Sequence, residues 1–265
     1  MKRFVLTVLI LASVACIGHC LEGAFGNKKR SYVSEQVSER TDDSSHAVSD
    51  SGRQYAPVDI AAGIRMIGVL GDSTVADFQI SETEVTLDQL YEVNGFAKRI
   101  DGYFPAVDLR LNEIVDFCNR LSELGGLSKC YSFDADGYCL CDFAASGYRL
   151  PTEEEWAYAF KGGRFSRGFA YSGSDSPDDV SWYEGNSDGA LHKVKMLRPN
   201  ELGLYDMSGN ASEICWPSNG YNFVAHGGNF ALSAGENLQQ YSSIRLLSDS
   251  DWKSGKNGFR IARKL

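Results

Sequence analysis

The chain has 265 residues, of which 43% are hydrophobic and 12% aromatic, enough for one domain with a substantial core. Its formal net charge of −9 argues against nucleic acid or an anionic membrane surface as the main partner. The 27 glycines indicate a fold with many loops.

The first twenty residues have the features of a targeting segment. Lys2 and Arg3 precede an apolar run over residues 4–11, which has signal-peptide length and is too short to span a bilayer. The sequence Ser13-Val14-Ala15-Cys16 resembles a bacterial lipobox, although Ser13 stands where leucine is usual. We predict a signal peptide over 1–15 with Cys16 acylated; cleavage after Ala15 without lipidation is the alternative, and a buried N-terminal helix is a weaker one.

A polar stretch follows, from Glu22 to about Tyr55, with few apolar residues and no periodic pattern. Such a stretch cannot bury enough surface to offset the entropy of ordering. We therefore predict a flexible, lipid-anchored tether over 16–55. An anchor, a tether and a domain over 56–265 predict an exported bacterial lipoprotein at the outer membrane or cell surface.

Two helices are predicted early in the domain, whose folded structure begins near Pro57. The first begins after Thr86, a favourable N-cap, and places Leu87 on an apolar face. The second gives the stronger pattern, because apolar residues recur at helical spacing before Gly125: Ile114, Phe117, Cys118, Leu121 and Leu124.

A third helix is predicted after Pro151. Thr152 and Glu155 form a capping box, and the acidic residues 153–155 favour the helix dipole at its N-terminus. Helix-start chemistry therefore accounts for these glutamates without a catalytic role. Trp156 is expected to turn inward.

A β-hairpin is predicted over 129–143, where two alternating runs flank the turn Asp134-Ala135-Asp136-Gly137. Asp134 and Asp136 are spaced as at the start of a calcium loop. The later ligands of such a loop are missing, which favours an ordinary turn.

The C-terminal region is a long irregular segment between two well-marked ends. Residues 203–213 are dense in turn formers and carboxylates, and 257–263 read as a turn leading into a strand. The residues after 230 have neither helical nor strand periodicity. Long loops in compact domains are commonly functional or disordered, and we predict that this one is functional.

Four motifs, at 149–156, 200–210, 227–230 and 258–260, read RLPTEEEW, NELGLYDMSGN, GGNF and GFR. In this order they resemble the formylglycine-generating-enzyme (sulfatase-modifying factor) branch of the C-type lectin-like fold, over roughly residues 64–263. The resemblance implies an α+β fold with two main helices, mostly antiparallel sheets and long ordered loops.

The resemblance does not extend to catalysis. The family's two catalytic cysteines would fall where residues such as Leu232 and Asn237 stand, and no cysteine follows Cys215. Thiol chemistry requires a thiol. The related iron-dependent branch needs a histidine cluster, yet two of the four histidines, His19 and His46, lie in the signal and tether. We therefore predict that the chain has no enzyme activity and no catalytic cofactor. The alternative is an enzyme, or an accessory of an enzyme, that uses another nucleophile. A third hypothesis is a structural lipoprotein of the cell envelope.

The chain also resembles the treponemal variable proteins of diversity-generating retroelements. That resemblance implies a non-catalytic lipoprotein whose segment at about 212–256 is diversified and binds an unknown protein or other surface ligand. The predicted face comprises Ser212, Ser218, His226, Ala231, Leu232, Gly235, Glu236, Tyr241, Arg245, Leu247, Asp249, Asp251 and Trp252. The opposing interpretation is that Leu246, Leu247 and Trp252 belong to the core.

Two further expectations come from the resemblance. It implies a structural calcium ion held by Asp206, Gly209, Ala211 and Glu213, with a turn bearing solvated carboxylates as the alternative. It also pairs Cys130 with Cys141 in a disulfide, for which Cys139 could compete.

Overall fold

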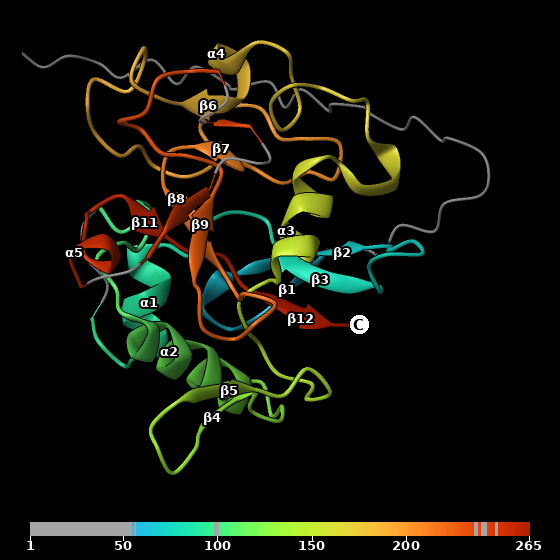
Figure 1. Ribbon diagram of the computed structural model, residues 1–265, viewed down its shortest axis with the longest axis vertical. Coiled ribbons are helices and arrows are strands. Elements are labelled where there is room, and N and C mark those ends of the chain that lie inside the picture. The colour runs from blue at the N-terminus through green and yellow to red at the C-terminus, as the bar shows by residue number, and fades with distance from the viewer. Residues whose placement is uncertain (1–54, 56, 98–100, 236–237, 240–242, 247–248) are drawn as a thin grey trace, which may run out of the picture. The chain divides into compact units, whose positions relative to one another are not determined.

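The computed structural model describes residues 55, 57–97, 101–235, 238–239, 243–246 and 249–265 (Figure 1). The chain divides into two compact units, 1–50 and 51–265, and every described residue belongs to the second. The predicted signal peptide and Cys16 therefore lie outside the described residues, as does the tether apart from Tyr55. No helix among the described residues is long and apolar enough to cross a membrane.

The first sheet joins both ends of the domain. Its strands run in the order β1-β2-β3-β12, and every neighbouring pair is antiparallel. The strands are β1 (Val58–Asp59), β2 (Arg65–Val69), β3 (Phe78–Ser81) and β12 (Ala262–Lys264). Because β12 pairs with β3, the C-terminal end of the chain is fixed on the first part of the domain.

The second sheet is built from the C-terminal region. Its order is β10-β9-β8-β11, with β11 parallel to β8 and the other pairs antiparallel. The strands are β8 (Ser212–Cys215), β9 (Val224–His226), β10 (Ser243–Arg245) and β11 (Asn257–Gly258). Of the residues after 230 that were predicted to be irregular, Ser243–Arg245 belong to this sheet as β10 and Asp249–Trp252 form a short helix.

Two small sheets complete the strands. The predicted hairpin is confirmed as β4 (Tyr131–Phe133) and β5 (Cys139–Cys141), which pair antiparallel. Strand β6 (Ser181–Trp182) pairs in parallel with β7 (Ser208–Gly209).

The three predicted helices are confirmed as α1 (Leu87–Val93), α2 (Leu111–Leu124) and α3 (Glu153–Phe160). Capping boxes begin α1 at Thr86 and α3 at Thr152. The apolar face of α2 is buried as predicted except at Leu124, which is 63% exposed because the helix ends there. Shorter helices are η1 (Ala61–Gly63), η2 (Gly163–Phe165), α4 (Pro177–Val180) and α5 (Asp249–Trp252).

The main core consists of two large apolar clusters. One surrounds α2 and includes Phe117, whose ring meets that of Phe259 edge-on at 5.4 Å. The other packs Trp156 and Phe160 of α3 against β2 and β3, and Figure 1 shows α3 lying on these strands. The α+β fold with mostly antiparallel sheets is thus confirmed.

Replacement of Phe259 by alanine should destabilise the domain by about 3–5 kcal/mol, because it empties a fully buried ring site between the C-terminal turn and α2. Urea unfolding measures the change. Phe165→Ala is the matched control, since that ring is 42% exposed and its loss should cost within about 0.5 kcal/mol. Equal losses in the two variants would contradict the assignment of Phe259 to the core.

Candidate ligand-binding surface

A buried ion pair holds the two ends of the C-terminal segment together. Arg260, which is fully buried, donates from Nε to Glu213 Oε2 and from Nη2 to Glu213 Oε1, both at 2.5 Å. Trp156 Nε1 donates to the same Glu213 carboxylate at 2.6 Å. These contacts therefore connect β8 to helix α3 and to Arg260, which lies just after β11.

Arg260 also ties in two other parts of the domain. Its Nη1 donates to the Ser81 carbonyl at 2.9 Å, and its Nη2 to the Tyr205 carbonyl at 2.8 Å. One guanidinium thus satisfies buried acceptors from β3, from the turn before β7 and from β8. These contacts fix both ends of the C-terminal segment to the same part of the domain.

Two more carboxylates lie near this pair. Burial raises the pKa of Glu84 well above its usual value, and the charge of Asp206 is the second largest cause of this shift. Glu84 Oε1 accepts from the Asn210 side-chain amide at 3.1 Å, whereas Oε2 has no hydrogen-bond partner among the described residues. Burial also raises the pKa of Asp206 to about 6, against the opposing effect of the Lys195 backbone amide that donates to it at 2.7 Å.

The predicted calcium ligands do not fit that role in this structure. Both oxygens of Glu213 are engaged by Arg260, so a guanidinium takes the place beside this carboxylate where a cation was expected. The alternative of a turn with solvated carboxylates is wrong, because Asp206 and Glu213 are buried.

Two residues predicted for the ligand-binding face are buried. Ser212 is fully buried, since β8 is covered on both sides, and its hydroxyl accepts from the Asn229 side-chain amide at 3.1 Å. His226 is only 9% exposed because its ring stacks on Trp156, with 5.3 Å between the ring centroids. The expectation that these two side chains face solvent was wrong.

The remaining described residues of the predicted face have some exposure. Ser218 and Arg245 are exposed, and five are partly exposed: Ala231, Leu232, Gly235, Asp251 and Trp252. Trp252 packs on Phe223 at 5.4 Å between ring centroids, so the core interpretation holds for it in part, and it holds fully for the buried Leu246. Glu236, Tyr241 and Leu247 lie outside the described residues, as does the side chain of Asp249.

The cysteines of the hairpin are free thiols, so the structure does not contain the predicted Cys130–Cys141 disulfide. The register pairs Tyr131 with Cys141, and the Asp142 amide donates to the Cys130 carbonyl at 2.7 Å. Cys130 lies just before β4, and both it and Cys141 belong to the apolar cluster around α2 without being bonded to each other.

Sequence reasoning missed two features. Glu84 was given no role in the sequence analysis, although its carboxylate belongs to the buried charge cluster. A cleft beside Trp252 was also missed, although aromatic residues on both sides of the hairpin turn, Phe133 and Tyr138, form part of its wall. Exposed rings flanking a tight turn were the available signal.

Comparisons with known proteins agree on the fold. The family of sulfatase-modifying factor enzyme 1-like domains matches residues 65–265. Chaperone protein LppX of Paenibacillus barcinonensis is 32% identical, over 54% of this chain and 63% of that protein. The formylglycine-generating enzyme of Streptomyces coelicolor is 30% identical, over 44% of this chain and 47% of that enzyme. The chain thus covers less than two thirds of the length of either relative.

Among solved structures, variable protein 1 of Treponema denticola is similar with a TM-score of 0.65 and 25% identity. The similarity covers 76% of this chain and 95% of that one. It supports the resemblance drawn from the sequence motifs and a fold suited to binding ligands.

Replacement of Arg260 by glutamine should destabilise the domain by about 3–5 kcal/mol, because Glu213 would remain buried without its counter-charge. Urea unfolding at pH 7 measures this loss. Arg263→Gln, three residues later and partly exposed, is the control and should have a much smaller effect. A loss no larger than that of the control would show that the pair does not hold the segment.

The melting temperature should be the same in EDTA and in millimolar calcium, because Arg260 already neutralises Glu213. A cation bound at 100 times its Kd would add about 2.7 kcal/mol, a shift of several degrees in a domain of this size. A rise of this size in the melting temperature when calcium is added would support the predicted metal site.

Proposed function

The chain belongs to the family of sulfatase-modifying factor enzyme 1-like domains, and we propose that it is a ligand-binding rather than a catalytic member. The observation that carries the proposal is the similarity to variable protein 1 of Treponema denticola, over 95% of that chain. In this proposal a rigid buried frame holds residues 212–256, and the exposed side chains of that segment contact the ligand.

The state of the thiols supports a non-catalytic role. Burial raises the pKa of Cys139 to about 11 and that of Cys141 to about 12. Burial likewise raises the pKa values of Cys118, Cys130 and Cys215, so these thiols are protonated at neutral pH. The thiolate is the reactive form of cysteine. Copper-dependent oxygen consumption with a cysteine-containing peptide would favour the alternative, an enzyme of the sulfatase-modifying type.

We further propose that the protein is a lipoprotein displayed at the outer membrane or cell surface. The lipobox-like sequence ending at Cys16 and the polar tether support this location. Its partner is then an unidentified protein or other surface ligand, and the chain contacts the membrane through the lipid anchor. Labelled palmitate should be incorporated by the natural chain and not by Cys16→Ser; equal labelling would rule out acylation at Cys16.

Diversification by a retroelement can be tested in the surrounding DNA. If the proposal is right, a near-copy of the codons for Ile214–Lys264 lies nearby, differs mainly at adenines and accompanies a reverse transcriptase gene. Sequencing of the locus decides this point. A locus without the near-copy would leave a ligand-binding domain with a fixed sequence.

The proposed face should tolerate substitution. The triple variant Ser218→Ala, Arg245→Ala and Asp251→Ala alters exposed or partly exposed side chains, each expected to change stability by within about 0.5 kcal/mol. Thermal melting should therefore stay close to that of the natural chain. A collapse comparable to that of Phe259→Ala would assign these residues to the core and remove the proposed face.

A further inference from the structure

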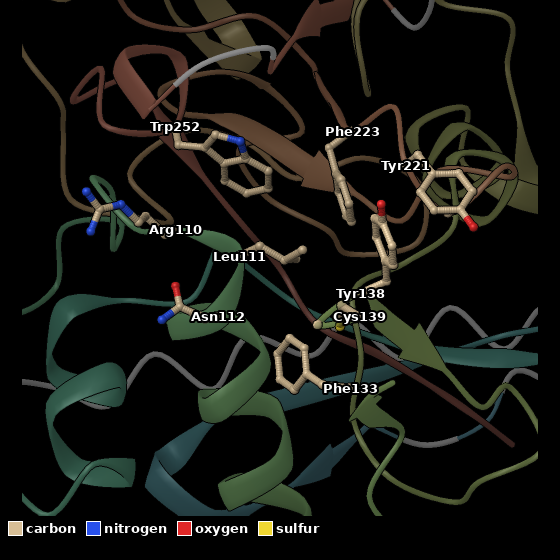
Figure 2. Close-up of a pocket in the computed structure, with 11 residues that line it drawn as sticks. Arg110, Leu111, Asn112, Phe133, Tyr138, Cys139, Tyr221, Phe223 and Trp252 are labelled. Carbon is tan, nitrogen blue, oxygen red and sulfur yellow. The ribbon is translucent and has the colours of Figure 1, made fainter. Parts of the chain in front are cut away.

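A cleft of about 540 Å³ opens beside α5 (Figure 2). Its walls come from the start of α2, from the β4–β5 hairpin, from the loop between β8 and β9, and from Trp252. Clefts of about 300–1,000 Å³ are typical of ligand sites. Except for Trp252, its lining residues lie outside the set predicted for the ligand-binding face.

Aromatic rings dominate this cleft and are unusually exposed. Phe133 is 51% exposed, Tyr138 56% and Tyr221 69%. The rings of Tyr138 and Tyr221 meet edge-on at 5.9 Å, and Phe223 links this pair to Trp252. Contiguous exposed apolar surface of this kind marks an interaction site in a globular domain.

Two polar side chains of the cleft wall, those of Arg110 and Asn112, do not point into it. In Figure 2 the Arg110 guanidinium and the Asn112 amide point away from the rings, whereas the Leu111 side chain extends into the space between the rings. The Cys139 thiol, with a pKa raised to about 11 by burial, is neutral at physiological pH. A sugar or nucleotide needs several convergent hydrogen-bonding groups, so the cleft is better suited to an apolar group.

We propose that the cleft binds an apolar side chain of a protein partner and acts as an anchor point that adjoins the variable face. This inference rests on the proposed function, because Trp252 belongs both to the cleft and to that face. Tyrosine and tryptophan, both present in the lining, are among the residues that dominate binding energy in protein interfaces. The cleft supplies affinity through apolar burial, and the neighbouring exposed residues of 212–256 supply specificity.

The test selects peptides from a random twelve-residue library displayed on phage, with the whole chain as the target. Enriched peptides should share an apolar residue at one position. Tyr138→Ala and Phe133→Ala should each lower the affinity of the selected peptides at least about tenfold, the size expected for an interface residue that dominates binding. Since both rings are exposed, thermal melting should show that the two variants remain folded.

Matched controls carry the same changes elsewhere on the surface. Tyr103→Ala and Phe165→Ala remove rings that are 64% and 42% exposed and do not line the cleft. They should change the affinity less than about twofold, as expected for a residue outside an interface. Controls that weaken binding as much as the cleft variants would overturn the proposal.

Other outcomes separate the cleft from the proposed function. If the peptides bind Arg245→Ala and Ser218→Ala more weakly but bind Tyr138→Ala as before, the proposed variable face is supported and the proposed role of the cleft is overturned. Loss with Tyr138→Ala alone would support the cleft and remove the variable face. If the enriched peptides share no apolar residue, the proposal that the cleft binds an apolar side chain is overturned. The proposal is also overturned if a glycan competes with the peptides for the natural chain but not for the Tyr138→Ala variant.

Discussion

The ion pair between Glu213 and Arg260 is the constraint on which the C-terminal half depends. The two residues are 47 positions apart, and nearly the whole segment proposed to vary lies between them. Strand β11 pairs with β8 in parallel just before Arg260, so backbone and side-chain contacts close the segment at one place. A loop closed in this way keeps its ends fixed even when residues between them change. A binding surface carried on a loop requires such a frame.

Burying this pair has an electrostatic cost that the neighbouring carboxylates increase. The charges of Glu84, Asp206 and Glu213 all act on one guanidinium, and desolvation disfavours the ionised forms of Glu84 and Asp206. The pKa of Asp206, about 6 in the folded protein, exceeds the usual value of about 3.9. The folded state therefore binds more protons than the unfolded state between these values, so the stability contributed by Asp206 falls as the pH rises through that window. When some of these carboxyl groups are protonated, their total negative charge comes closer in size to the single positive charge of Arg260.

Local sequence patterns predicted the elements whose causes are local. Capping boxes begin α1 and α3, and the apolar spacing of α2 identified its buried face. Long-range contacts decided the rest. Ser212 is buried because β8 is covered on both sides, and Glu213 is taken by an arginine that local spacing cannot pair with it. The hairpin was predicted, but its register, which places Cys130 opposite Asp142, required the structure.

The same contacts limit what diversification could change. Within the segment, Phe223, Leu238 and Leu246 are buried and belong to the apolar clusters of the domain. The Leu238 carbonyl also accepts from the Ser208 hydroxyl at 3.0 Å, which ties the segment to β7. Because emptying such apolar sites costs several kcal/mol, variation compatible with folding must spare them and act on exposed neighbours such as Arg245. A segment that looks irregular in sequence thus contains its own framework residues, and buried and exposed positions are interspersed within it.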